Sequence, residues 1–314
     1  MHETRTAGSG HTPWQDAAPV VAQPVAHPAA HFAAFSFVDR IDEVQAAEAG
    51  SDAGVGAMRA AGRYHVPAHV HEFPGCLVAE AIGQLAAWVS MSQIGFTGRP
   101  VAALAGETRF HASVAPGSML ELEVGIESCD AGSVAYHGAA HVDGVCVLEL
   151  ERCLGPMLPA ADFDDPEALR VRFESLCKGG ADRDRFAGVA VPLPELVEHL
   201  PGESLRAILT VPRHAEFFSD HFPRRPVFPA TLLLNEQMKL GLQLLSSANP
   251  HSDAPFTPVR MRNVKMRSFI QPGDAVEIQA RVRGLDAEHA VLAFSARIDG
   301  KIVATSELEL EALR

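Results

Sequence analysis

Apolar and polar residues alternate along several segments of this chain, and one long segment is apolar almost throughout. Residues 76–94 contain no proline and few polar side chains, a pattern that predicts a buried helix. A strand is expected from Phe35 to Val38 and onward through residues 40–44. Three later segments alternate and are separated by turn residues, which predicts antiparallel strands at residues 118–128, 133–142 and 145–153. A strand, a long helix and a run of antiparallel strands together are typical of an α+β fold.

The second half of the chain repeats landmarks of the first half at a nearly constant spacing. Three pairs of landmarks lie 155 or 156 residues apart: Pro74 and Pro229, Pro116 and Pro272, and Asp143 and Asp299. A constant offset over three landmarks indicates an internal duplication. Each copy alone would leave a sheet edge and a helix surface uncovered. We therefore expect the copies to meet face to face as a pseudo-dimer within one chain.

The duplication divides the chain into four parts. Residues 1–31 are rich in Ala, Pro and His and predict a disordered tail. The two copies are expected at residues 32–158 and 189–314. Residues 159–188 between them predict a linker with one short helix, which ends before the pair of glycines at positions 179–180. Since the tail has no apolar run of signal-peptide length, we expect a cytoplasmic protein.

Composition and charge exclude several classes of protein. The net charge of −13 makes a nucleic-acid partner unfavourable, since phosphate binding needs a basic surface. The acidity is uneven, because residues 31–160 contain 15 acidic and 6 basic residues, whereas residues 191–314 contain 15 and 14. Five cysteines are an odd number without metal-ligand spacing, which argues against a disulfide framework or a zinc site. Glu80 and Gln84 within the apolar helix argue against a membrane span there.

The most specific motif covers residues 221–235, which read His-Phe-Pro-Arg-Arg-Pro-Val-Phe-Pro-Ala-Thr-Leu-Leu-Leu-Asn. This run strongly resembles the signature of the β-hydroxyacyl-acyl carrier protein dehydratases, which have the hot-dog fold. In that family His-Phe-Pro-x-x-Pro-x-x-Pro-Gly precedes a helix that bears a catalytic Glu or Asp. Residues 73–84 of the first copy resemble the helix part of the signature. The resemblance implies tandem hot-dog domains, each with a long central helix wrapped by an antiparallel sheet.

Each copy departs from the family pattern in one half of the catalytic pair. The second copy has His221 but has Asn235 where the family has its acid. The first copy has the acid, Glu80, but Val66 stands at the position of the histidine, with His65 beside it. In hot-dog dehydratase dimers the His of one protomer works with the acid of the other. The resemblance therefore implies one composite site of His221 and Glu80, and a degenerate second site of His65 and Asn235.

The side chains of the implied site suit the removal of water from a 3-hydroxyacyl thioester. A histidine has an ordinary pKa of about 6.5, which fits His221 as the base for the C2 proton. Glu80 is expected to act as the acid for the departing hydroxyl or as a hydrogen-bond anchor, because desolvation on an apolar helix favours the protonated carboxyl. Backbone N–H groups at a helix start, at Gly75 or Ala230, would hold the charge on the thioester oxygen. Gln84, one turn after Glu80, would orient its carboxylate.

The resemblance also implies a partner. The acyl group would arrive on the phosphopantetheine of an acidic acyl carrier protein or of CoA, with no other cofactor and no metal. Basic residues near His221 and in the same copy could steer such a carrier, unless they form an ordinary solvated face. These candidate docking residues are Arg224, Arg225, Arg260, Arg262, Lys265 and Arg267. Whether two pseudo-dimers pair further stays open.

We therefore expect dehydration of 3-hydroxyacyl thioesters to trans-2-enoyl thioesters in fatty-acid or polyketide-type biosynthesis. Two alternatives remain at this point: a hot-dog thioesterase in which Glu80 works without His221, and a catalytically silent module that binds acyl groups or carrier proteins. The sequence leaves open the acyl length, the pathway, residual activity in the second site and whether isomerisation follows. A CoA-dependent (R)-specific hydratase is disfavoured because its Asp-x-Asn-x-x-His pattern is absent.

Overall fold

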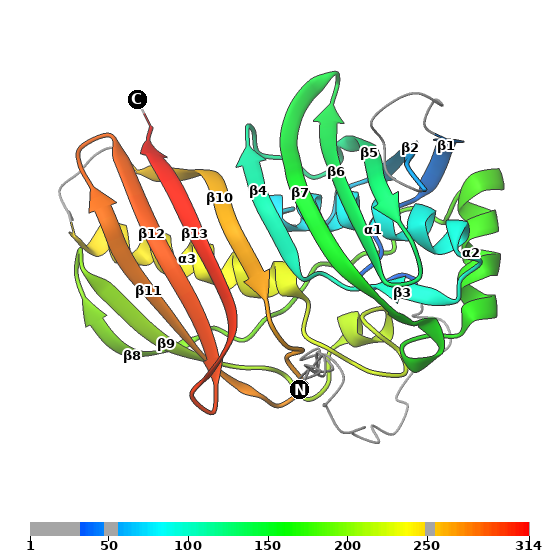
Figure 1. Cartoon of the computed structure of the whole chain (residues 1–314). Coiled ribbons are helices and arrows are strands. Elements are labelled where there is room, and N and C mark those ends of the chain that lie inside the picture. The colour runs from blue at the N-terminus through cyan, green and yellow to red at the C-terminus, as the bar shows by residue number, and fades with distance from the viewer. Residues whose placement is uncertain (1–31, 47–55, 249–254, 314) are drawn as a thin grey trace, which may run out of the picture.

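A long antiparallel sheet and two helices packed against one side of it form the body of the protein (Figure 1). The computed structural model describes residues 32–46, 56–248 and 255–313, so the predicted tail at residues 1–31 lies outside the described residues. The two helices are α1 (Gly75–Gln93) and α3 (Ala230–Ala248). This architecture is the α+β tandem hot-dog fold that the sequence predicted, and the fold class is confirmed.

The two halves contribute the same arrangement of strands. The first half supplies, in spatial order, β1 (Arg40–Ala46), β2 (Met58–His65), β5 (Met119–Cys129), β6 (Ser133–Val142), β7 (Val145–Pro159) and β4 (Leu104–Phe110). The second half continues with β10 (Phe256–Met266), β13 (Lys301–Ala312), β12 (His289–Ile298), β11 (Ala275–Leu285), β9 (Ser204–Thr210) and β8 (Glu195–Leu200). The short β3 (Gly98–Pro100) pairs with β7 outside this path. Read outward from β4 and β10, the two orders match element by element, as a duplication requires.

The two halves join edge to edge, so the expectation of face-to-face packing is wrong. Strands β4 and β10 pair antiparallel, with Arg260 opposite Arg109 and Val264 opposite Ala105. This pairing satisfies the backbone groups of both edges and makes one continuous sheet. Helices α1 and α3 also contact each other beneath it.

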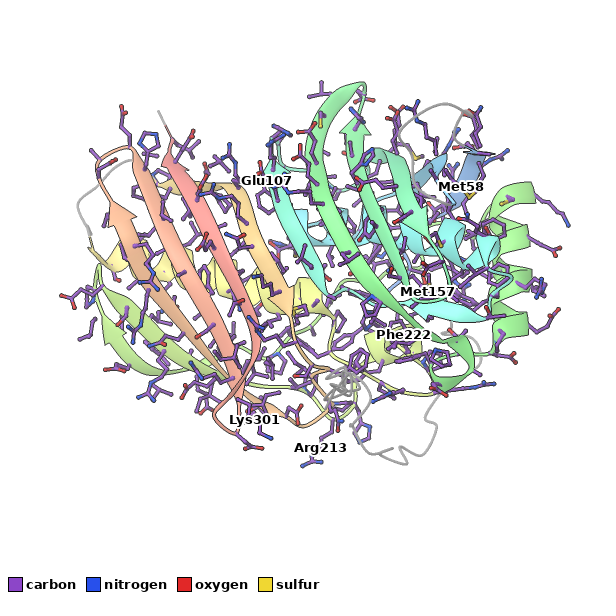
Figure 2. All side chains as sticks on the ribbon, in the orientation of Figure 1. Met58, Glu107, Met157, Arg213, Phe222 and Lys301 are labelled. Atoms are coloured by element: carbon purple, nitrogen blue, oxygen red, sulfur yellow. The ribbon has the colours of Figure 1, made fainter. Side chains whose placement is uncertain are left out.

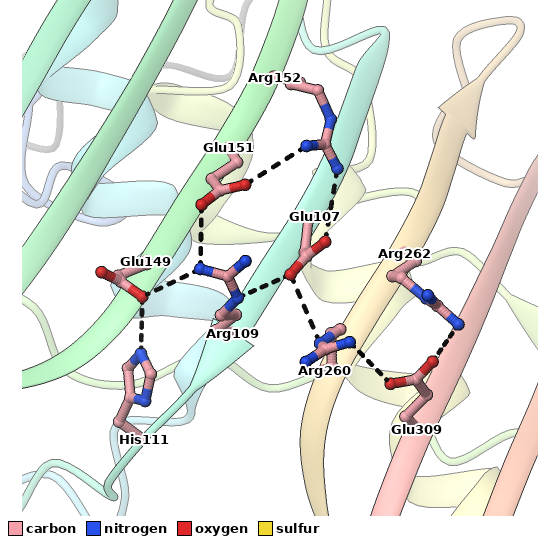
Figure 3. Close-up of polar contacts among 9 residues, drawn as sticks. All are labelled: Glu107, Arg109, His111, Glu149, Glu151, Arg152, Arg260, Arg262 and Glu309. Atoms are coloured by element: carbon pink, nitrogen blue, oxygen red, sulfur yellow. Dashed lines mark hydrogen bonds and ion pairs between the residues drawn. The ribbon is translucent and has the colours of Figure 1, made fainter.

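A network of charged side chains crosses the seam on the outer face of the sheet (Figure 3). Glu107 accepts from Arg109 Nε at 2.7 Å and lies 3.4 Å from Arg260 Nε. Arg260 and Arg262 both pair with Glu309 on β13. Because like charges directly opposite on neighbouring strands destabilise a sheet, the carboxylates between these arginines stabilise the seam.

The segment before β1 is not the strand that its alternation predicted. Phe35, Phe37 and Val38 are buried, but the segment is irregular, and the strand begins at Arg40. Side chains satisfy the backbone here, because Phe35 N donates to Asp220 at 2.7 Å and Phe37 N donates to Gln84 at 2.7 Å. The segment therefore packs against residues of both halves without joining the sheet.

The connection between the halves contains the expected short helix. A 3-10 turn (Ala160–Asp162) leads to α2 (Pro166–Lys178), which lies beside β1. Asp165 caps the helix by accepting from Glu167 N at 3.0 Å, and Gly179 stands at its carboxyl end. Strand β7 runs to Pro159, which is longer than the strand predicted at 145–153 and one residue past the predicted domain boundary.

Within the described residues, α1 is the helix that is long and apolar enough to span a bilayer by length and composition. However, 61% of that stretch is buried inside the protein. Its most enclosed side chains include Ile82 and Leu85, which are fully buried. Helix α1 is thus the core helix of the first half.

Candidate active site

A mainly apolar cavity of about 210 Å³ lies between the two halves. Its wall includes Glu80 and Gln84 from α1, His221 from the segment before α3, and Ala230 at the start of α3. The apolar part of the wall includes Phe32, Ala86, Met91, Leu150, Phe228 and Ile270. The predicted histidine and acid therefore line one cavity, although they lie 141 positions apart in the chain.

Glu80 is fixed by one donor from each half of the protein. Gln84 Nε2, one helical turn further along α1, donates to Glu80 Oε1 at 3.1 Å. Thr231 Oγ1, in the first turn of α3, donates to Glu80 Oε2 at 2.8 Å. Gln84 is itself held by Phe35 O and Phe37 N. The carboxyl group therefore has a defined orientation in the cavity.

His221 is held so that one ring nitrogen remains to accept a proton. Its Nδ1 lies 3.2 Å from the carbonyl oxygen of Val227. In the neutral imidazole this contact assigns the proton to Nδ1, which leaves the lone pair on Nε2. Burial lowers the pKa of His221 below its ordinary value of 6.5, while the Glu80 carboxylate opposes that shift. The ring is therefore neutral near pH 7 and suited to act as a base.

The two candidate oxyanion positions differ in their surroundings. Ala230 lines the cavity at the N-terminus of α3, where backbone N–H groups favour negative charge. Gly75 begins α1 and packs against Phe110, because a Cβ at this position would lie 2.9 Å from that ring. Gly75 is not part of the wall that contains His221 and Glu80. Of the two, Ala230 has the better placement for this cavity.

The two residues of the predicted degenerate site lie in different surroundings. His65, at the end of β2, contacts Asp184 of the linker through Nδ1 at 3.1 Å. The linker residue Phe186 is buried against Phe37 and Phe73, with ring centroids 5.0 Å and 6.0 Å away. Asn235 is buried in α3. The linker therefore covers the part of the first copy that carries the histidine position.

The candidate docking residues do not form one uniform surface. Arg260 and Arg262 are engaged by the carboxylates of the seam, as Figure 3 shows. Lys265 and Arg267 follow on the same strand and its exit, and both are exposed. Arg224 and Arg225 follow His221 by three and four residues. Arg224 Nη1 donates to Ala161 O at 3.0 Å, and Arg225 lies over the rings of Phe163 and Phe269.

Among the described residues, His111, Cys146 and Glu149 place donor atoms within 4.8 Å of one another. None of the three lines the cavity, and Figure 3 shows His111 and Glu149 within the charged network of the sheet. The Glu149 carboxylate there already contacts His111 at 2.9 Å and Arg109 at 3.6 Å. These contacts account for the cluster as part of the charged network.

Sequence reasoning missed several polar residues of the cavity wall, among them Thr231, Arg99 and Asp220. Thr231 follows Ala230 directly, and a hydroxyl in the otherwise apolar first turn of α3 was a usable signal. Asp220 precedes His221, and its buried carboxylate accepts from Phe35 N and Ser36 Oγ. Arg99 comes from β3 and carried no signal in the sequence, because only the fold brings it to the cavity.

The fold and the cavity define a double hot-dog protein with a histidine and a carboxylate from different halves. Comparison with known proteins agrees with this class. Residues 29–151 match the FabA-like domain, and residues 198–307 match the ApeI-like family, the ApeI dehydratase. The chain belongs to the 3-hydroxyacyl-acyl-carrier-protein dehydratase family.

Relatives cover part of the chain, and a structural neighbour covers most of it. The 3-hydroxyacyl-acyl-carrier-protein dehydratase FabZ of Shewanella sp. (strain MR-4) is 30% identical over 121 residues, which are 37% of this chain and 78% of that protein. The same enzyme of Geobacter metallireducens is 30% identical over 118 residues, 36% of this chain and 77% of that protein. A crystal structure from Lactobacillus plantarum, described as an oleoyl thioesterase, superposes with a TM-score of 0.54. It covers 84% of this chain and 99% of its own at 9% identity, a likeness that shows the fold alone.

Proposed function

We propose that this protein dehydrates 3-hydroxyacyl thioesters to trans-2-enoyl thioesters in fatty-acid or polyketide-type biosynthesis, at one composite site between its halves. The observation that carries the proposal is that His221 and Glu80 line one apolar cavity, with the Glu80 carboxyl oriented by Thr231 and Gln84. Membership of the dehydratase family supports the same reaction. The apolar wall suits an acyl chain, and the polar groups gather around the two candidate catalytic residues.

The reaction divides between the two residues. Nε2 of neutral His221 accepts the C2 proton, and charge develops on the thioester oxygen, where the backbone N–H of Ala230 stabilises it. The Glu80 carboxylate takes up a proton from solvent before the reaction and gives it to the 3-hydroxyl, which leaves as water while the C2–C3 double bond forms. The protons taken and given balance, so the net change is the loss of one water. His221 and Glu80 then exchange protons with solvent before the next cycle.

The carrier that delivers the acyl group is an acyl carrier protein in this proposal. Its acidic surface would meet Arg224 and Arg225 beside His221, together with exposed Lys265 and Arg267. Arg260 and Arg262 contribute less, since Glu107 and Glu309 already neutralise them. CoA thioesters carry the same phosphopantetheine arm and serve as the comparison substrates.

The decisive test is a product assay with 3-hydroxyacyl groups of several lengths, on carrier protein and on CoA. We expect a mass loss of one water with the thioester intact. Release of free thiol would instead identify a thioesterase, and tight acyl binding without turnover would identify a binding module. Either result would refute the dehydratase proposal.

Replacing Asn235 with alanine is expected to leave kcat/KM within about twofold of wild type. A carboxamide does not exchange protons near neutral pH, so a second site that contains Asn235 contributes nothing to turnover. The measurement is kcat/KM at a temperature well below the unfolding midpoint, because removal of a buried amide lowers stability by about 1 kcal/mol. A hundredfold loss in a folded Asn235→Ala protein would mean that Asn235 serves the working site.

A further inference from the structure

The first residues of the linker pack directly on the segment that carries His221. Arg224 N donates to Phe163 O at 3.0 Å, and Arg224 Nη1 donates to Ala161 O at 3.0 Å. The ring of Phe163 meets that of Phe222 edge to face, with centroids 5.3 Å apart. Both rings are buried, and Phe222, which lines the cavity, lies on the side of the first half in Figure 2, below Met157. The linker is thus in contact with the residue that follows His221.

A buried ion pair connects the same part of the linker to His221. Arg99 Nη1 lies 3.0 Å from Asp164 Oδ2, and the two side chains are only 14% and 2% exposed. The Arg99 guanidinium lies over the Phe222 ring, 4.3 Å from its centroid. The Phe222 ring in turn stacks on the His221 imidazole, with centroids 4.3 Å apart and an interplanar angle of 20°. A continuous series of contacts therefore connects the Asp164 carboxylate to the His221 imidazole through Arg99 and Phe222.

We propose that Arg99 and Asp164 are a positioning pair that holds the His221 ring in the cavity through Phe222, so that the linker is part of the working site. The inference rests on the proposed function of His221 as the base. Arg99 and Asp164 act through Phe222 and are not catalytic residues. The linker would then have a second role besides covering the histidine position of the first copy with Asp184 and Phe186.

The Arg99–Asp164 pair also contributes to the electrostatic field around the His221 imidazole. Among the described residues that line the cavity with His221, the charged groups are Glu80 from α1, Arg99 from β3 and Asp220, which precedes His221. Glu80 favours the protonated ring, and the positive charge of Arg99 disfavours it. The negative charge of Asp164 partly offsets the positive charge of Arg99, because the two side chains form an ion pair. Removing Arg99 should therefore raise the pKa of His221, and removing only the charge of Asp164 should lower it.

The kinetic test compares Arg99→Met and Asp164→Asn. We expect kcat to fall about tenfold in each, with KM within about twofold, because a displaced base affects the chemical step more than binding. Asparagine cannot replace Asp164 fully, since its one oxygen cannot accept from both Arg99 and Asp165 N. The matched control is Arg170→Met, which removes an arginine that lies 5.3 Å from the Phe96 ring, away from the cavity. It should keep wild-type kcat.

The second test reads His221 directly and needs no substrate. Its imidazole signal in the full-length labelled protein is assigned by its loss in His221→Ala, and then titrated by NMR. We expect the pKa to rise by about half a unit in Arg99→Met and to fall by about half a unit in Asp164→Asn. Arg99→Lys keeps the charge but not the planar group over Phe222. It should leave the pKa near wild type while lowering kcat.

Opposite shifts of the His221 pKa in Arg99→Met and Asp164→Asn, with a loss of kcat in both, would support the proposed positioning role of the two residues. Unchanged titration and unchanged kcat, or equal shifts in one direction, would overturn it. If Arg99→Met fails to fold, Asp164→Asn and Arg99→Lys decide the question by the same measurements. If the wild-type protein dehydrates no 3-hydroxyacyl thioester, the proposed function fails, but the titration still decides whether the pair controls His221.

Discussion

Replacing His221 with alanine is expected to lower kcat/KM for a 3-hydroxyacyl thioester by at least about 10³-fold. The imidazole is the proposed acceptor of the C2 proton, and loss of a general base costs about 10²- to 10⁴-fold. Its Nδ1 contact with Val227 O at 3.2 Å leaves Nε2 for that task. The measurement is the rate of water loss from the thioester, followed by mass, in a variant whose circular dichroism matches wild type.

The control for this variant is His65→Ala, which removes the histidine of the first copy. His65 contacts the half-exposed Asp184, and its loss should leave kcat/KM unchanged. Full activity in His221→Ala would refute the composite site. Equal losses in both variants would mean that two sites work, and the degenerate-site hypothesis would then be wrong.

Most of the fold was accessible from the sequence because its signals are local or periodic. The apolar segment at 76–94 gave α1 (Gly75–Gln93) to within one residue at each end, and alternation gave β5 and β6 closely. The constant offset between the copies predicted matching halves. The edge-to-edge pairing of the two halves was not predicted, because nothing local in β4 or β10 indicates that these two strands pair with each other.

The candidate site was predictable only where a motif carried it. His221 and Glu80 followed from two sequence runs, and the structure brings both to one cavity. Arg99 and Asp164 could not be found in this way, because a short strand and a linker carry no pattern that relates them. The segment from Phe35 to Val38 was misassigned for a related reason. Its backbone partners are the side chains of Asp220 and Gln84, 185 and 47 residues away.

Two copies in one chain can carry different residues at matching positions, as the proposed single composite site requires. In a dimer of identical chains, a substitution of the acid changes both sites at once, because symmetry repeats it. In this chain Asn235 and Glu80 occupy matching positions on α3 and α1 but can differ. The linker occurs once in the chain and has no symmetry mate, so its two ends contact different residues. Phe163 packs on Phe222, and Phe186 packs on Phe73.

Replacing Glu80 with glutamine is expected to lower kcat by at least about 10²-fold while the protein stays folded. The amide oxygen can still accept from Gln84 Nε2, and the amide nitrogen can donate to the hydroxyl of Thr231, so both hydrogen bonds of Glu80 have a substitute. What is lost is a group that can give a proton to the departing hydroxyl. The measurements are the enoyl product formed per enzyme and the unfolding midpoint, which should change little.

The matched control is Glu236→Gln, which neutralises a buried carboxylate on α3, one residue after the counterpart of Glu80. Glu236 pairs with the exposed Lys239 at 3.1 Å and is not part of the cavity wall, so kcat should stay near wild type. The double variant of His221→Ala and Glu80→Gln should be about as slow as either single variant, since residues that act as a unit are strongly non-additive. Losses that multiply in the double variant would mean that the two residues act independently. The single composite site would then be the wrong description of this cavity.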